Sequence, residues 1–345
     1  MSIFKLYRIT MLSLWSLLAV VWSPSSFAIT QSELEQLTPQ QAYEKGKLLS
    51  WQYKYDESNQ YLKYAADKGD ADAAIIYASN VRGNALIMKP EEYKYVIVAA
   101  EKNQPFGLLK AASNRNYQGK KDREYWRQKA LTYFNKKIQA GDVGALFYKA
   151  SLIPDENDKL NWIERAAKAG FPQAQYYMAE YYKNGNGTFY IPGKREKEIK
   201  RLYKEAAEAG YPPAISDYGY LLRSEGLKKE GWEWVVKRAN TGDAEAILEV
   251  ADIYSAMYKP LDSVPQDKVK SAGYFKVYYQ SMNVDINDDK QSAYYEDYQK
   301  LLSTMTGEEK AQADKFAKDF LATHTVRAFD GFWQWGVDYG IKPSQ

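Results

Sequence analysis

Apolar and small residues recur along the chain in a register set by a glycine or an asparagine. These anchor positions are Gly69, Asn103, Gly141, Gly170, Gly210 and Gly242, and successive anchors lie 29 to 40 residues apart. The residue seven positions before each anchor is apolar: Leu62, Val96, Phe134, Ile163, Tyr203 and Val235. Each glycine anchor is followed four positions later by an alanine: Ala73, Ala145, Ala174, Ala214 and Ala246. A repeat of this length predicts stacked pairs of amphipathic α-helices.

The residues around each anchor supply the end of one helix and the start of the next. Glycine tolerates the left-handed backbone just beyond a helix, and asparagine is the second choice at that position. Asp70, Asp142 and Asp243 directly follow their anchors and can cap the next helix. Pro172 and Pro212 fall in the first turn, where a proline loses no hydrogen bond. We therefore expect an antiparallel helix pair to meet at each anchor.

The predicted fold class is all-α: a right-handed α–α solenoid of stacked helix-turn-helix repeats with N- and C-terminal capping helices. Residues 29–55 are expected to form the N-terminal cap and residues 56–302 the repeats. Residues 303–345 are expected to form a C-terminal capping helix and an aromatic tail. The pattern lapses near 260–289, which indicates a looped insertion. Such a solenoid is a curved rod with an extended concave surface.

The first residues have the three parts of a secretory signal. Lys5 and Arg8 precede an apolar run over 9–21, and small residues stand three and one before a cleavage point after Ala28. The alternative is a membrane anchor, but this run is shorter than the ~20 residues that a spanning helix needs. Residues 1–28 are therefore predicted to be a cleaved signal peptide, with a periplasmic or secreted mature chain and no further membrane span.

The unit Ala-Ala-x-x-Gly-x-x-x-Ala, present at 166–174 and 206–214, resembles the Sel-one-like repeat, a relative of the tetratricopeptide repeat. The resemblance extends in weaker form over residues 40–258. The Gly-x-Gly-x-x-x-Asp loop of the family is mostly missing, and residues 184–193 form an enlarged loop. The resemblance implies an exported bacterial protein that binds other proteins. Members serve as adaptors, as regulators of envelope or secretion machinery, and as immunity proteins against secreted effectors.

The composition removes most catalytic and metal chemistry. The 345 residues include no cysteine and one histidine, which excludes disulfides, thiolate metal sites, cysteine nucleophiles and multi-histidine metal centres. A net charge of +3 gives no general basic surface for nucleic acid. There is no phosphate-binding glycine loop and no Gly-x-Ser-x-Gly motif. We therefore expect no enzymatic activity, no cofactor and no metal.

Two further groups of side chains resemble parts of catalytic sites. His324 directly follows the predicted C-terminal helix, where an interaction with the helix end is a sufficient explanation. The pairs Glu91–Glu92 and Asp288–Asp289 could suggest glycosidase carboxylates, but acidic residues are favoured at helix starts in any case. We therefore expect both pairs at solvated helix starts.

One segment has the spacing of a calcium-binding loop. Asp285, Asn287, Asp289 and Glu296 match the oxygen ligands of such a loop. Lys290, however, stands in place of the glycine that permits its sharp turn. We favour an acidic helix cap here, and calcium binding remains the alternative.

Aromatic residues outside the repeat consensus are the candidates for contact with a protein partner, because aromatic rings offer large contact area at interfaces. These are Trp51, Tyr53, Tyr55, Tyr117, Phe189, Tyr190, Trp333 and Trp335. The leading hypothesis is a periplasmic scaffold that binds and neutralises or regulates a protein, in particular a secreted toxic effector. The alternatives are an adaptor of envelope, flagellar or secretion machinery, and an enzyme acting on envelope polysaccharide or lipid.

Overall fold

The architecture is a stack of antiparallel helix pairs. The computed structural model describes residues 29–83, 86–113, 122–255, 264, 266–284 and 289–329, and in this part of the chain there are seventeen helices and no β-strand. In chain order they are α1 (Gln31–Glu35), α2 (Pro39–Trp51), α3 (Tyr55–Asp67), α4 (Ala71–Arg82), α5 (Pro90–Glu101), α6 (Pro105–Ser113), α7 (Arg123–Gln139), α8 (Gly144–Ala150), α9 (Glu156–Lys168), α10 (Pro172–Lys183), α11 (Lys194–Glu208), α12 (Pro212–Ser224), α13 (Lys228–Ala239), α14 (Ala244–Ser255), α15 (Lys268–Ser281), α16 (Asp289–Ser303) and α17 (Gly307–Thr323). From α2 to α15 each helix packs against the next. The prediction of an all-α solenoid is confirmed.

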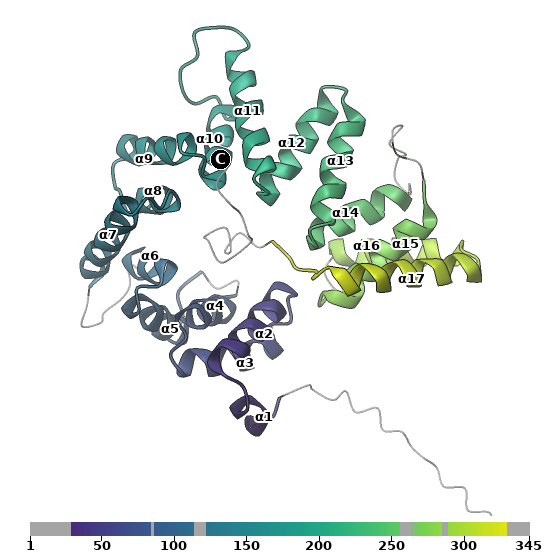
Figure 1. Cartoon of the computed structure of the whole chain (residues 1–345), viewed down its shortest axis with the longest axis horizontal. Helices are drawn as coiled ribbons and strands as arrows, with labels where there is room; N and C mark the ends of the chain where they lie inside the picture. The colour runs from purple at the N-terminus through teal and green to yellow at the C-terminus, as the bar shows by residue number, and fades with distance from the viewer. Residues whose placement is uncertain are drawn as a thin grey trace, which may run out of the picture.

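The pairs follow one another around a ring (Figure 1). On one side of this ring, α4, α6 and α8 lie toward the centre, and α5, α7 and α9 lie toward the outside. None of the helices within the described ranges is long and apolar enough to cross a membrane.

The anchor residues end helices as the sequence predicts. At the end of α9, Gly170 has φ 85°, and the amide of Phe171 donates to the carbonyl of Ala166 at 3.0 Å. Asn103 adopts the same left-handed conformation with φ 61°. These hydrogen bonds satisfy carbonyls at the end of a helix that otherwise lack partners, and they reverse the chain into the next helix.

Small residues set the distance between helices. The alanines four positions before the anchors, among them Ala99 and Ala166, are fully buried. Between α5 and α6 the backbones come closer still, since a Cβ atom at Gly107 would lie 2.6 Å from the amide nitrogen of Ala100. Large side chains fill the remaining space around these contacts. This alternation gives the dense interior that a continuous repeat core requires.

Tyrosines link neighbouring helices through carboxylates. The hydroxyl of Tyr95 on α5 donates to Asp67 on α3 at 2.7 Å. The hydroxyl of Tyr176 on α10 donates to Asp217 on α12 at 2.8 Å. Such bonds let a tyrosine bury its ring while its polar end stays satisfied, which explains how the repeat core accommodates many tyrosines.

The segment expected as a looped insertion near 260–289 contains helix α15 (Lys268–Ser281), so this part of the prediction is wrong. Phe275 is fully buried, and Tyr274 and Tyr278 are buried beside it. Helix α15 packs against α14, α16 and α17. A helix covered on several sides has no single apolar face, and its sequence therefore lacks the amphipathic period that identifies a surface helix.

Residues 324–329, which we call the clasp, run back from α17 to the turn between α13 and α14. The amide of Arg327 donates to the carbonyl of Gly242, and the amide of Ala244 donates to the carbonyl of Arg327, both at 2.9 Å. The two chains form a short parallel bridge at this point. Further on, Phe329 packs its ring against Tyr211 at the start of α12, with the centroids 5.7 Å apart.

The clasp and the loop after α15 also contact the N-terminal end of the solenoid. The amide of Ala328 donates to the carbonyl of Trp51, and the amide of Asn283 donates to the carbonyl of Gln52, both at 2.8 Å. The side-chain amide of Gln52 donates to the carbonyl of Val326 at 3.1 Å. The two ends of the solenoid are therefore joined. The molecule is a closed ring, whereas the sequence pattern led us to expect an open curved rod (Figure 1).

Candidate protein interface

The candidate contact residues predicted from the sequence fall into three groups. Tyr117, Trp333 and Trp335 lie outside the described residues, and their role stays a prediction. Trp51, Tyr53 and Tyr55 come together where the ring closes. Phe189 and Tyr190 come together on the loop between α10 and α11.

The group formed by Trp51, Tyr53 and Tyr55 serves ring closure. Trp51 is only 5% exposed, and the guanidinium of Arg327 lies 5.3 Å from the centre of its ring. The carbonyl of Tyr53 accepts a hydrogen bond from the side chain of Asn283, and the Tyr53 ring packs on the core of the C-terminal helices. Tyr55 is more exposed and lies beside Tyr53. Trp51 is therefore buried by the chain itself, and its side chain is not accessible to a partner.

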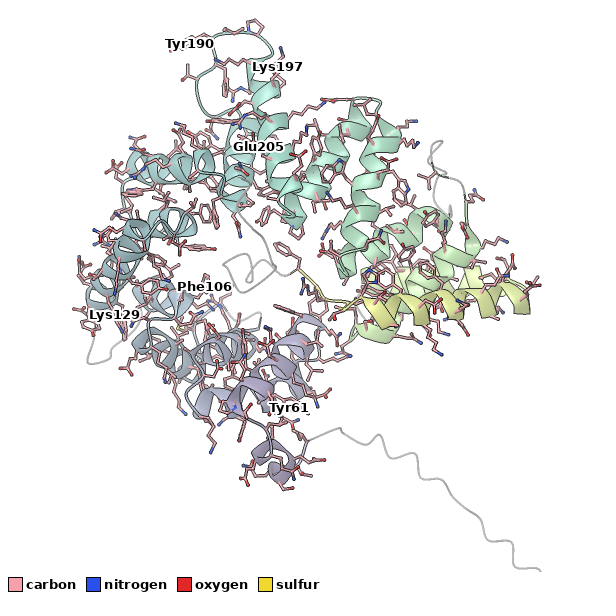
Figure 2. The ribbon with its side chains drawn as sticks, viewed as in Figure 1. Tyr61, Phe106, Lys129, Tyr190, Lys197 and Glu205 are labelled. Atoms are coloured by element: carbon pink, nitrogen blue, oxygen red, sulfur yellow. The ribbon has the colours of Figure 1, made fainter. Side chains whose placement is uncertain are left out.

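The group formed by Phe189 and Tyr190 lies on a loop that extends away from the ring (Figure 2). This loop, which we call the α10–α11 loop, spans residues 184–193. The guanidinium of Arg195 donates to the carbonyls of Tyr182 at 2.8 Å and of Gly187 at 3.0 Å. It also donates to the carbonyl of Asn186. One side chain at the start of α11 thus fixes three carbonyls at and near the start of the loop.

An aromatic contact completes this support. The ring of Phe189 meets Tyr182 edge to face at 5.0 Å, and the guanidinium of Arg195 lies 4.8 Å from the centre of the Phe189 ring. Gly187 has φ 71°, and a Cβ atom there would lie 2.9 Å from the Tyr182 ring. Both the left-handed backbone and the close ring require glycine at this position. Phe189 is therefore an internal support of the loop.

The tip of the loop presents two apolar side chains to solvent. Tyr190 is 90% exposed and Ile191 is 62% exposed. Figure 2 shows Tyr190 at the far end of the loop, away from the ring. Because the loop is already held by Arg195 and Phe189, binding through its tip would cost little conformational entropy. The sequence identified Tyr190, but it missed Ile191 and Arg195; the enlarged loop around them was the available signal.

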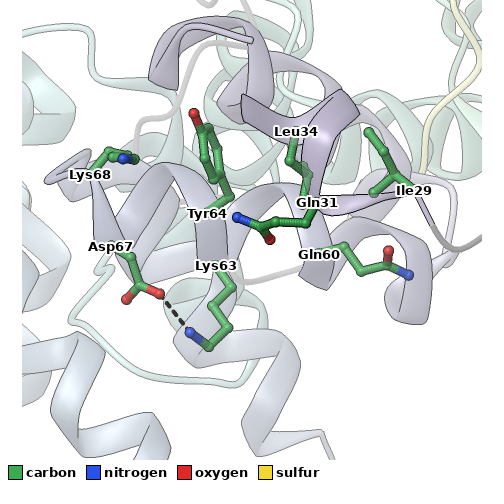
Figure 3. A pocket seen from close by; sticks show the side chains of 8 residues that line it. All are labelled: Ile29, Gln31, Leu34, Gln60, Lys63, Tyr64, Asp67 and Lys68. Carbon is green, nitrogen blue, oxygen red and sulfur yellow. Dashed lines mark hydrogen bonds and ion pairs between the residues drawn. The ribbon is translucent and has the colours of Figure 1, made fainter. Parts of the chain in front are cut away.

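A cavity of about 520 Å³ lies between α1 and α3 (Figure 3). Its wall carries Lys63 and Asp67, which form an ion pair at 2.5 Å. Asp67 also accepts the hydroxyl of Tyr95. Lys63 and Asp67 are thus satisfied by the chain's own groups, and the Nζ of Lys68, which also lines the cavity, lies 5.7 Å from the centre of the Tyr64 ring.

The side chains that resembled catalytic groups have local structural roles. His324 follows α17, where Nδ1 lies 3.1 Å from the carbonyl of Phe320 and its ring stacks on the Phe320 ring at 4.2 Å. Glu91 and Glu92 both lie in the first turn of α5. The expectation of a solvated pair is wrong for Glu92, which is 0% exposed, because the ends of α4 and α6 cover it with Arg82 and Lys110.

Two of the four residues proposed as calcium ligands, Asp285 and Asn287, lie outside the described part of the chain, so calcium binding stays a prediction. The same holds for Asp288 of the second acidic pair. Within the described part, no three histidine, aspartate or glutamate side chains gather as metal ligands do.

Fold and surface together define a ring-shaped helical repeat protein with a supported apolar loop. No protein-family model matches the chain, and no curated protein matches it. Among solved structures, a protective antigen of uropathogenic Escherichia coli strains with an SLR fold shares 18% identity at a TM-score of 0.44. That match covers 84% of this chain, which spans only 62% of the antigen.

Two other solved structures are similar over a shorter stretch. A Sel1 repeat protein from Oxalobacter formigenes shares 20% identity at a TM-score of 0.35, with 60% of this chain and 86% of that one covered. The Pseudomonas aeruginosa protein PA5086 shares 17% identity at a TM-score of 0.42, with 61% and 81% covered. Two of the three structures are thus described by the repeat that this sequence resembles.

Proposed function

We propose that this protein is an exported, non-enzymatic scaffold that binds another protein and neutralises or regulates it. The specific role that we favour is that of a periplasmic immunity protein against a secreted toxic effector. The signal sequence predicted over 1–28 supports export. The closed helical ring supports binding without chemistry, because a neutralising protein needs only a rigid surface complementary to its target.

The α10–α11 loop is the observation that carries this proposal. The adjacent, highly exposed apolar side chains of the described chain include the pairs Leu86–Ile87 and Tyr190–Ile191, and the second pair stands on a loop that Arg195 holds in place. Tyrosine is among the residues that dominate binding energy at interfaces, especially where it enters a pocket of the partner. The loop has the geometry for such an insertion, since Tyr190 and Ile191 stand at its tip and Arg195 holds its start.

Binding to the product of an adjacent effector gene tests the function. The purified protein is expected to form a complex with that effector and to protect cells that express it. Tyr190→Ser should weaken the complex at least tenfold, which corresponds to the loss of ~1.4 kcal/mol or more. Tyr220→Ser is the matched control, because Tyr220 is also an exposed tyrosine (66%) but lies on α12.

A second variant separates the tip from its support. Arg195→Met keeps Tyr190 but removes the hydrogen bonds that hold the loop, and it should mainly raise the dissociation rate. If neither complex formation nor protection is seen with the wild-type protein, the immunity role is wrong. If Tyr190→Ser and Tyr220→Ser behave alike, the loop is not the contact surface.

A further inference from the structure

A groove of about 650 Å³ lies at the C-terminal ends of the inner helices α4, α6 and α8. Its walls come from the end of α4, from α6, from the start of α7 and from the turn after α8. Phe106 on α6 belongs to its lining and lies on the inner side of the ring in Figure 2. The groove is thus built from three successive repeats, and its volume falls in the range of ligand sites, ~300–1,000 Å³.

Among the described residues that line the groove, the charged ones are all basic. These residues are Arg82, Lys110, Arg123 and Arg127. Arg82, Lys110 and Arg123 lie 28 and 13 residues apart in the sequence, and Arg127 lies one helical turn after Arg123. The fold brings all four to one place. In a chain with almost equal numbers of basic and acidic residues, four cations in one groove are a local excess of positive charge.

The nearby carboxylates only partly balance this charge. Glu92 lies behind the wall of the groove, with Oε1 3.6 Å from Arg82 and 3.9 Å from Lys110. Both distances exceed that of a hydrogen bond. Glu124 accepts from Arg127 at 3.2 Å, at the outer edge. Glu92 and Glu124 thus pair with Arg82, Lys110 and Arg127 among the described residues.

The position of Arg123 is not explained by helix stability. Arg123 is the first residue of α7 and is exposed. The start of a helix carries partial positive charge, so a cation there is unfavourable by ~0.3–1 kcal/mol. Arg82 and Lys110, by contrast, lie in the last turns of α4 and α6, where the partial negative charge of the helix end stabilises a cation. Glu124, the next residue, offsets part of this cost, since Arg123 is among the cations that lower the pKa of Glu124; an acidic ligand in the groove would offset more.

The apolar part of the lining narrows the class of ligand. Leu109, Leu152, Ile153 and Pro154 line the groove together with Phe106. The guanidinium of Arg127 donates to the carbonyl of Leu152 at 3.1 Å, which holds this wall in place. A bare phosphate chain has no group for such a lining, whereas a peptide can place carboxylates against the cations and an apolar side chain between them.

Burial and the neighbouring charges also act on the ionisation of Lys110. Burial lowers the pKa of Lys110 to about 8; Glu92 opposes the shift and Arg82 adds to it, while Arg123 and Arg127 face the same groove from α7. A ligand carboxylate would favour the charged form again.

We propose that this groove binds an acidic peptide segment of the protein partner, with glutamate or aspartate residues flanking an apolar side chain. The inference rests on the proposed scaffold function and names the chemistry of part of its partner. The groove and the α10–α11 loop are built from different repeats, so the two surfaces can be tested separately.

The test uses the purified protein and a fluorescein-labelled peptide, Glu-Leu-Glu-Phe-Glu-Leu-Glu, with fluorescence anisotropy as the readout. A peptide with glutamine in place of each glutamate should bind at least tenfold more weakly. Arg123→Glu in the protein should also weaken binding of the acidic peptide at least tenfold. This variant places an acid at a helix start, which favours folding, so its loss of binding is not a consequence of unfolding.

Lys168→Glu is the matched control, since it makes the same charge change at an exposed lysine on α9 outside the groove. Equal binding of the two peptides, or unchanged binding by Arg123→Glu, would overturn the inference. Tighter binding of a single-stranded oligonucleotide of the same charge would overturn it too, in favour of a nucleic-acid site. If Arg123→Glu still captures the effector at full affinity, the groove assignment fails while the scaffold function stands.

Discussion

The substitution Gly242→Ala tests whether the clasp closes the ring. Gly242 has φ 84°, and a Cβ atom at this position would lie 2.2 Å from the carbonyl oxygen of Thr325 in the clasp. That oxygen belongs to the backbone and cannot rotate away as a side chain would. Gly210→Ala is the matched control, because Gly210 has φ 87° and its added Cβ would meet no atom within 4 Å.

The two variants should differ by the free energy that holds the clasp. Both pay the strain of alanine in a left-handed conformation, ~1–2 kcal/mol. Gly242→Ala should also lose the two hydrogen bonds at Arg327, worth ~1 kcal/mol each, and the burial of Val326, worth ~1.5–3 kcal/mol. We therefore expect Gly242→Ala to cost about 3 kcal/mol or more beyond Gly210→Ala, because detachment of the clasp relieves the overlap with Thr325 but loses these contacts.

Hydrogen exchange is the suitable assay, because repeat proteins open locally and a single unfolding transition can hide such an event. In Gly242→Ala three amides should exchange at least tenfold faster: that of Arg327, which bonds to Gly242, and those of Ala328 and Asn283, which bond across the closure. X-ray scattering should show a larger radius of gyration if the ring opens. In Gly210→Ala all three amides should keep their protection. Equal protection in the two variants would refute the reasoning.

Three further predictions concern the core, the groove and the N-terminus. Phe275→Ala should cost ~3–5 kcal/mol and unfold the C-terminal helices first, as measured by hydrogen exchange. Lys110 has a pKa of about 8 in the folded protein, so between pH 8 and 10.5 the unfolded chain binds more protons than the folded one. The free energy of unfolding should therefore rise over this range by up to ~3 kcal/mol. Urea titrations of Lys110→Met should lack this rise. Mass spectrometry of the exported protein should find Ile29 as the first residue; retention of residues 1–28 would contradict the signal peptide.

The parts of the fold that follow from sequence are local. A turn glycine, an N-capping aspartate and an alanine one turn into the helix act within a few residues of one another, so Gly170 and its neighbours identify a helix pair unaided. Repetition then implies stacking, because each pair leaves an apolar face for the next. The solenoid was predictable for this reason.

The parts that escaped prediction depend on contacts between distant residues. Nothing around Val326 or Ala328 indicates that these residues will meet Gln52 and Trp51, and no repeat pattern extends into the clasp. Helix α15 was missed because it is covered on several sides. The basic groove was missed because Arg82 and Arg123 become neighbours only through folding.

Ring closure changes what this solenoid can offer to a partner. In an open solenoid each terminal repeat has a single neighbour and opens most easily. Here the N-terminal turn at Gln52 and the C-terminal clasp each gain a second set of contacts, so both ends are restrained. The packing of α8, α9, α10 and α11 sets the distance between the basic groove and the α10–α11 loop, and ring closure limits how far this stack can bend. A partner that engages both surfaces would then lose little further entropy at its second contact, and opening the ring by Gly242→Ala should weaken such binding without touching either surface.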